Sequence, residues 1–237
     1  MEREELLRAS AERHSVRAYD GRELTAEDKA YLEARIAEIN AEAGLHIQLV
    51  CGESGAFDSL LAHYGKISGV VNYLVLEGPN TPRLDELCGY WGELLVLEAQ
   101  VRGMRTCWVG GTFSRRKAQF TLAKGERLCL VVSVGYGITD GRQHPAKKTA
   151  ADVSTVPAGV QAPAWFAAGV EEALMAPTAM HQQKFSFEYL PLIGAGADGE
   201  AGKVRATTKG GPFTKVDLGI AKLHFELGSG KDSDIWA

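Results

Sequence analysis

The sequence lacks the features that mark membrane proteins and nucleic-acid-binding proteins. No apolar run approaches the roughly 20 residues that a helix needs to cross a bilayer. The first ten residues, MEREELLRAS, are charged throughout, unlike a signal peptide. A formal net charge of −4 leaves no general excess of basic side chains for phosphate backbones or lipid headgroups. We therefore expect a cytoplasmic protein with neither a nucleic-acid nor a membrane partner.

Cysteine is also scarce, with four residues in a chain of 237. The four lie far apart, no pair forms Cys-x-x-Cys, and no histidine stands at metal-ligand spacing. A disulfide framework and a zinc site are therefore both unexpected. We expect buried, reduced thiols that pack as small apolar side chains, and no bound metal.

What the sequence does contain is typical of a packed globular protein, with 45% hydrophobic residues. Apolar periodicity predicts helices over 1–12, 25–43, 84–102 and 163–174, and strands over 46–50, 70–76, 106–109, 128–136 and 184–190. Residues 216–226 are predicted to form a further helix or a helix followed by a strand. Helices interleaved with strands indicate an α+β or α/β architecture. The Gly- and Pro-rich stretch 137–162 predicts a long crossing segment, and 194–211 predicts an exposed loop.

The run Arg13-His14-Ser15-Val16-Arg17 is the first candidate for binding chemistry. Alternate side chains of an extended chain share a face, so Arg13, Ser15 and Arg17 can point at one ligand. The planar fork of arginine donates two parallel hydrogen bonds to a phosphate or a carbonyl edge. A solvated charged loop is the alternative interpretation of the same residues.

A second candidate is the segment 176–183, APTAMHQQ, which follows a predicted helix. Pro177 disfavours helical geometry at Ala176 and so ends that helix. The imidazole and amide groups that follow can both donate and accept hydrogen bonds, which suits a ring edge carrying carbonyl and N–H groups. A polar loop leading into a strand fits the segment equally well.

Two further pairs carry weaker signals. Gly110-Gly111 allows close approach of the backbone to a ligand, although a plain turn is the commoner meaning of paired glycines. No Gly-x-Gly-x-x-Gly follows the first predicted strand, so this is not a dinucleotide fingerprint. Lys147-Lys148 indicates a solvated surface unless the fold brings both lysines to the same phosphate as Arg13.

The order of these signals resembles the FMN-dependent nitroreductase family. RHSVRAYD resembles its opening Arg-[Arg/His]-Ser-x-[Arg/Lys] run, and APTAMHQQKFSF resembles its Ala-Pro-Ser-x-x-Asn-x-Gln-Pro-Trp segment. GYWGELLVLEAQVRGMRTCWVGG is similar to its central helix and following glycine turn, and GYG with the two lysines is similar to its phosphate clamp. The resemblance implies an α+β nitroreductase-like fold, with a central, mostly antiparallel sheet flanked by helices and two pseudo-symmetric halves.

One departure from the family pattern is large. The Ala-Pro segment follows Lys148 here, whereas ordinary family members carry it a few tens of residues after the Arg-x-Ser run. Ordinary members are homodimers whose two FMN sites each take residues from both subunits. The chain thus resembles a fused and trimmed dimer, with a first half at 1–150 and a shortened second half at 151–237. Because the second half has no Arg-x-Ser run, the resemblance implies one FMN per chain and a monomer.

Positions carried over from the family assign a role to each candidate. Arg13, Lys147 and Lys148 would hold the FMN phosphate, Ser15 and Arg17 the pyrimidine edge, and Gly110 and Gly111 the central ring. The full predicted set is Arg13, His14, Ser15, Arg17, Val109, Gly110, Gly111, Lys147, Lys148, Pro177, Thr178, Ala179, His181 and Gln183. His181 stands where Asn is usual, and Lys184 where Pro is usual. No residue is predicted to be catalytic, since the cofactor supplies the chemistry.

The implied reaction passes a hydride from NADH or NADPH through FMN to a small acceptor such as a nitroaromatic or a quinone. Two alternatives from other classes stay open: an FMN-binding protein without turnover, as a flavin store or sensor, and a degenerate member that acts by interaction alone.

Overall fold

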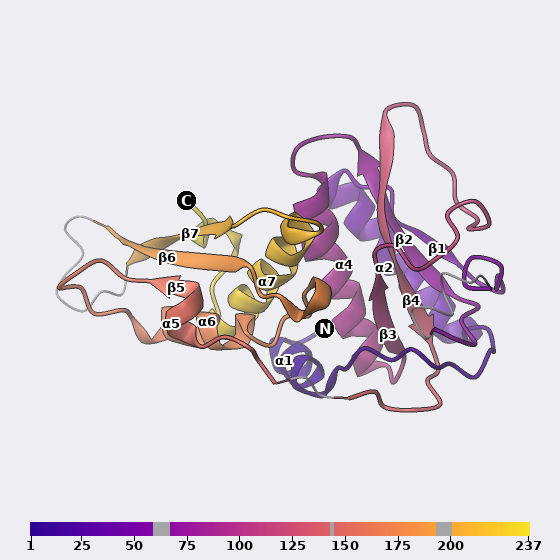
Figure 1. Ribbon diagram of the computed structural model, residues 1–237, viewed down its shortest axis with the longest axis horizontal. Coiled ribbons are helices and arrows are strands. Elements are labelled where there is room, and N and C mark those ends of the chain that lie inside the picture. Colours follow the sequence, from indigo (N-terminus) through magenta and orange to yellow (C-terminus); the bar gives the residue numbers. More distant parts are fainter. Residues whose placement is uncertain (59–66, 143–144, 193–200) are drawn as a thin grey trace.

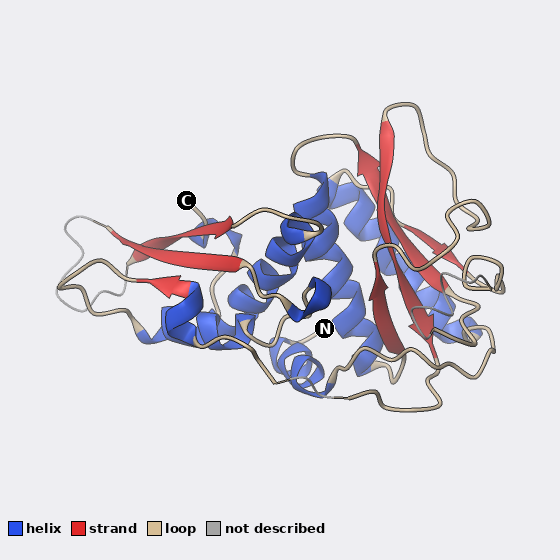
Figure 2. Cartoon of the chain, in the orientation of Figure 1, coloured by secondary structure: helices blue, strands red, loops and turns tan. Residues whose placement is uncertain are grey.

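The computed structural model describes residues 1–58, 67–142, 145–192 and 201–237, which form an α+β structure with two separate sheets (Figure 1 and Figure 2). The helices are α1 (Arg3–Glu12), α2 (Ala26–Ala43), α4 (Leu84–Val101), α5 (Ala150–Val153), α6 (Ala164–Ala173) and α7 (Thr214–Ser229), with 3-10 turns η1 (Ala179–His181) and η2 (Ser233–Ile235). The strands are β1 (Gln48–Val50), β2 (Tyr73–Pro79), β3 (Arg105–Val109), β4 (Glu126–Gly135), β5 (Ser154–Thr155), β6 (Phe185–Pro191) and β7 (Gly202–Thr208).

The larger sheet has the order β1-β2-β4-β3, and every neighbouring pair is antiparallel. Strand side chains alternate between the two faces, so Leu74 and Leu76 pack with the helices while Tyr73 and Val75 pack beneath the loops on the opposite face. The central strand β4 is buried on both faces, which explains its continuous apolar sequence.

Helices α2 and α4 begin and end where local chemistry dictates. The Thr25 hydroxyl accepts a hydrogen bond from the Asp28 N–H at 3.1 Å, which caps α2 at its start. Gly44 ends the same helix in the left-handed conformation, with φ of 64°. Gly103 takes φ of 81° just after α4 and turns the chain into β3. The sequence predicted all of these boundaries to within two residues.

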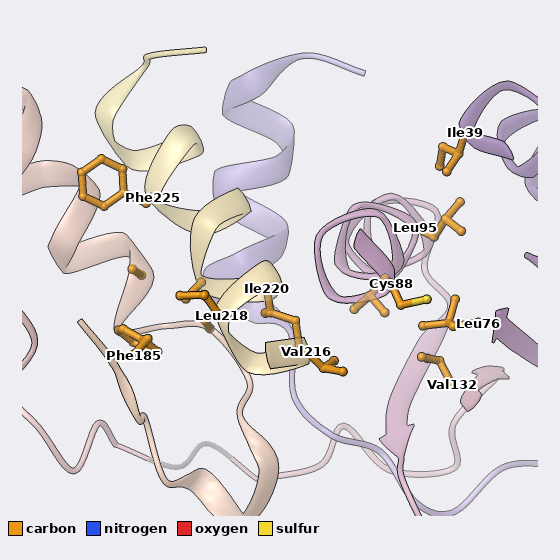
Figure 3. Packing of buried hydrophobic residues seen from close by; sticks show 14 of the residues in the cluster. Ile39, Leu76, Cys88, Leu95, Val132, Phe185, Val216, Leu218, Ile220 and Phe225 are labelled. Atoms are coloured by element: carbon orange, nitrogen blue, oxygen red, sulfur yellow. The ribbon is translucent and has the colours of Figure 1, made fainter. Parts of the chain in front are cut away.

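The second half of the chain adds a smaller sheet, β5-β6-β7, in which β5 runs parallel and β7 antiparallel to β6. Helices α6 and α7 pack beside it, and α7 lies between this sheet and α4 (Figure 1). One buried hydrophobic cluster extends through both halves, from Leu76 and Val132 on the larger sheet to Phe185 and Phe225 at the smaller one (Figure 3).

Helices α4 and α7 approach each other through a reciprocal pair of glycines. A Cβ atom on Gly89 would lie 2.1 Å from the Val216 carbonyl oxygen, and one on Gly219 would lie 2.0 Å from the Glu86 carbonyl oxygen. Each glycine thus meets the residue three positions before the other glycine, which is the contact pattern of a two-fold interface. Only glycine fits at either position unless the helices separate.

Several elements differ from the sequence-based prediction. Strand β2 covers Tyr73–Pro79 instead of 70–76, and the crossing segment 137–162 contains α5 and β5. The expected loop 194–211 contains β7, and its residues up to 200 lie outside the described part of the chain. The loop prediction was wrong for β7 because that strand has one buried apolar residue, Val204, and forms by pairing with β6.

No helix in the described ranges is both long enough and apolar enough to cross a membrane.

Candidate functional site

Two adjoining cavities of about 390 Å³ each lie where the N-terminal segment, the end of β3 and the segment after α6 meet. They share the lining residues Ser15, Arg17, Pro177, Thr178 and Met180, and together they are called the cleft. The first cavity is also lined by Arg13, His14, Arg142, Lys147 and His181, among others. The second is also lined by Trp108, Val109, Gly110, Gly111, Ala179, Phe213 and Asp217, among others.

The segment from Arg13 to Arg17 runs in extended conformation beside β3. Arg13 caps the end of α1, with its N–H donating to the Ala9 carbonyl oxygen at 2.8 Å. The Val16 N–H donates to the Thr106 carbonyl oxygen at 3.0 Å, and the Val16 side chain is fully buried. The Val16 hydrogen bond and the buried Val16 side chain together fix the position of the segment. Arg13, Ser15 and Arg17 all line the cleft, as their alternation predicted.

The first cavity is strongly cationic. Arg13, Arg17, Arg142 and Lys147 all line it, and no acidic side chain is among the lining residues within the described ranges. Guanidinium and ammonium groups are the donors that bind phosphate most strongly. This end of the cleft is therefore suited to an anion.

The second cavity is more apolar and opens over the end of β3. Its lining includes the β3 end at Val109–Gly111 and three apolar side chains, Phe213, Val216 and Ile220. A Cβ atom on Gly110 would lie 2.5 Å from the Phe213 ring, so a side chain at position 110 would displace that ring. Gly111 faces open space, with no atom within 4 Å of a hypothetical Cβ. Glycine backbone and apolar side chains are a lining that suits a largely apolar ring.

The segment between α6 and β6 has an unusual backbone. Met180, His181 and Gln183 have φ of 52°, 53° and 44°, in the left-handed region that few residues other than glycine adopt. Asp217 on α7 secures this turn, accepting from the Ala179 N–H at 2.9 Å and from the Gln182 amide at 3.1 Å. Such strain persists only where the surrounding structure enforces it, and it gathers at binding sites.

The Asp217 carboxyl is buried against the second cavity. Burial raises its pKa to about 6, and the hydrogen bonds from Ala179 and Gln182 offset part of that increase. This carboxyl therefore titrates in a range where most carboxyls are already ionised.

Two of the predicted residues lie in the wall of the cleft and do not line it. The buried Gln183 side chain accepts from the Lys147 and Lys148 N–H groups at 2.8 and 3.2 Å, and donates to the Leu174 carbonyl oxygen at 3.0 Å. The Lys148 ammonium donates to the Gln183 carbonyl oxygen at 2.5 Å. Both side chains thus hold the backbone that presents Lys147 to the first cavity.

The remaining twelve predicted residues all line the cleft, although they come from four separate stretches of the chain. Sequence reasoning missed Arg142, Met180, Phe213 and Asp217. Arg142 follows the Gly-Tyr-Gly turn before the paired lysines, so extending the basic cluster upstream could have found it. Nothing in the spacing of Phe213 or Asp217 marks them, because α7 brings them to the cleft from a distance.

Within the described ranges, no group of His, Cys, Asp and Glu side chains has a geometry that could hold a metal ion. All four cysteines are unpaired, and Cys88 and Cys107 are buried.

The family model described as "Putative TM nitroreductase" matches residues 5–229 of this chain. A structure described as a "putative nitroreductase" from Thermotoga maritima superposes with a TM-score of 0.61 at 19% identity, covering 94% of this chain and 82% of that one. Bacillus megaterium NfrA2 superposes with a TM-score of 0.51 at 15% identity over 71% of this chain and 81% of that one. An FMN-dependent nitroreductase from Clostridium difficile gives a TM-score of 0.45 at 13% identity over 57% of this chain and 90% of that one.

No curated protein sequence matches the chain. At these identities the structural matches establish the fold alone, and it is the α+β nitroreductase fold. The family model, however, spans nearly the whole sequence. The chain therefore belongs to the nitroreductase family.

Proposed function

We propose that the cleft binds one FMN per chain and that the protein is an NAD(P)H-dependent oxidoreductase acting on a small acceptor such as a nitroaromatic or a quinone. When bound, FMN would supply hydride and electron transfer, taking a hydride from the nicotinamide and passing reducing equivalents to the acceptor. The residues of this chain would bind and orient both partners.

One observation carries the proposal: the N-terminal Arg13–Arg17 segment, the Gly110-Gly111 turn and the Pro177–Ala179 segment line one cleft. These are the stretches in which the sequence resembles the family's FMN motifs. More than 150 residues separate the first from the last, so their convergence is a property of the fold.

The chemistry of the lining residues fits FMN at both ends of the cleft. Arg13, Lys147 and Arg142 would hold the phosphate in the cationic first cavity. Ser15 and Arg17, which line both cavities, would meet the polar edge of the ring. Gly110, Gly111 and Thr178 would face the ring in the second cavity, where Gly111 leaves space for close approach.

The layout supports a fused and shortened dimer with a single site. The reciprocal contacts of Gly89 and Gly219 give the α4–α7 packing the form of a dimer interface inside one chain. The cleft takes residues from both the 1–150 and the 151–237 parts. Because the interface that pairs ordinary subunits is internal here, we propose a monomer with one FMN.

The test is the absorption spectrum of purified, FMN-reconstituted protein before and after anaerobic addition of NADPH or NADH. We expect flavin bands that bleach, and that return when a quinone is added. Arg17→Gln should weaken FMN binding, whereas Arg116→Gln, which removes the same charge at an exposed position outside the cleft, should not.

Each other outcome contradicts part of the proposal. Bound FMN that neither NADPH nor NADH bleaches would indicate a flavin store or sensor. Protein that takes up no FMN would leave only an interaction role.

A further inference from the structure

A network of charged side chains, three of them buried and one half-buried, lies behind the first cavity and comes from four helices or helix ends. His224 on α7 is fully buried, with Nδ1 3.2 Å from Glu172 Oε1 and Nε2 3.1 Å from Glu93 Oε1. Glu93 on α4 is also fully buried, and its Oε1 lies 3.8 Å from Nε of Arg13, at the end of α1. Arg13 lines the first cavity, so the charge network extends from the interior to the cleft.

The geometry at His224 favours an imidazolium. Both ring nitrogens face carboxylate oxygens, and a neutral ring would set a lone pair against one of them. The Ser10 hydroxyl, 3.2 Å from Nδ1, donates its single proton to Glu172 at 2.5 Å and can only accept from the ring. Burial would lower the pKa of His224, but the hydrogen bonds to Glu172 and Glu93 outweigh it and raise that pKa.

The charges therefore alternate along the network: Glu172 negative, His224 positive, Glu93 negative and Arg13 positive. Glu93 also contacts a residue outside the charge network, because its Oε2 accepts a hydrogen bond from Trp108 Nε1 at 2.8 Å. Trp108 lines the second cavity. One carboxylate thus connects the anion-suited end of the cleft with the wall of its ring-suited end.

Arg13 is held here by charge, and its hydrogen-bonding capacity is largely unused. Its side chain is 8% exposed, and neither Nε nor Nη1 has a hydrogen-bond partner among the described residues. Burying two guanidinium nitrogens without such partners is costly, so the nearby carboxylate of Glu93 is what stabilises Arg13 in this position. The separation of 3.8 Å from Glu93 fixes the group without consuming its donors.

We propose that Glu93, held in place by His224 and Trp108, is a positioning residue that orients Arg13 toward the phosphate of the bound flavin. This assignment rests on the proposed function. The role belongs to the phosphate alone, because Arg13 lines only the first cavity.

The experiment compares the affinity for FMN with that for riboflavin, which lacks the phosphate, by quenching of flavin fluorescence. Glu93→Gln should weaken FMN binding about tenfold, because a misdirected Arg13 would lose one charge-assisted hydrogen bond to the phosphate, which is worth about that factor. Riboflavin binding should stay unchanged, because the amide oxygen that replaces the carboxylate can still accept from Trp108 Nε1. In an Arg13→Gln background the same substitution should change neither affinity further. Glu98→Gln is the matched control: Glu98 is buried on the same helix but pairs with Arg35, outside the cleft.

The outcomes separate the two proposals. Equal weakening of FMN and riboflavin by Glu93→Gln, or tighter FMN binding, would overturn the role of Glu93 while the flavin site stands. Wild-type protein that binds neither FMN nor riboflavin would overturn the proposed function and, with it, the role of Glu93. If Glu93→Gln does not fold, Glu172→Gln tests the same charge network from its more exposed end. A smaller but phosphate-specific loss is expected there, and identical losses for both flavins would contradict the proposal.

Discussion

Replacing Gly219 by alanine tests whether the close α4–α7 packing holds the two halves together. In an ordinary helix this substitution stabilises a protein by about 1 kcal/mol, because glycine is the poorer helix former. Here the new Cβ atom would lie 2.0 Å from the Glu86 carbonyl oxygen and 2.8 Å from the Tyr90 nitrogen. Both obstacles are backbone atoms, so no side-chain rotation relieves the clash and the helices must separate.

The expected cost follows from these opposing effects. Overpacking a core typically costs about 1–3 kcal/mol, and a clash with backbone belongs at or above the upper end. After the gain in helix propensity, we expect a net loss of about 2 kcal/mol. For a chain of this size that corresponds to a fall in Tm of about 4–8 °C.

The assay is urea unfolding followed by circular dichroism for wild type, Gly219→Ala, Gly89→Ala and the double variant. Gly111→Ala is the control, because nothing lies within 4 Å of its hypothetical Cβ, and it should shift stability by less than about 0.5 kcal/mol. The two helix substitutions should be less than additive, since either one already separates the same pair of helices. A Gly219→Ala protein as stable as wild type would refute the reasoning about this interface.

Two further predictions concern the cleft. The pKa of Asp217 in the folded protein, about 6, lies above its ordinary value of 3.8, so folding takes up a proton between these values and stability falls as pH rises through that window. Relative to Asp217→Asn, wild type should therefore lose up to about 3 kcal/mol of unfolding free energy between pH 4 and pH 7, and parallel pH profiles of the two proteins would contradict this. Arg142→Gln should weaken FMN binding by about three- to tenfold without affecting riboflavin, measured by fluorescence quenching, because Arg142 lines only the first cavity; equal effects on the two flavins would place its contribution away from the phosphate.

The sequence alone predicted the elements whose signals are local. The cap of Thr25, the left-handed Gly44 and the wide apolar face of α4 each depend on neighbouring residues, and each appears where expected. Strand β7 was missed because its stability comes from pairing with β6, which is not visible in its own residues.

The same distinction applies to the cleft. The Arg13–Arg17 strip could be predicted because alternation along an extended chain is a local property. Gln183 has the right chemistry for a ligand contact, but the fold turns it toward the backbone at Lys147 and Lys148. Glu93 and His224 could not be found at all, since 131 residues separate them in sequence and only the packing of α4 against α7 joins them.

The central claim is a single FMN site built by both halves of one chain, and the most direct measurement is the binding stoichiometry. Native mass spectrometry of the FMN-reconstituted protein gives both the number of chains and the number of flavins in each particle. One chain carrying one FMN is the predicted result. Two FMN per chain, or flavin bound only in particles containing two chains, would contradict the account.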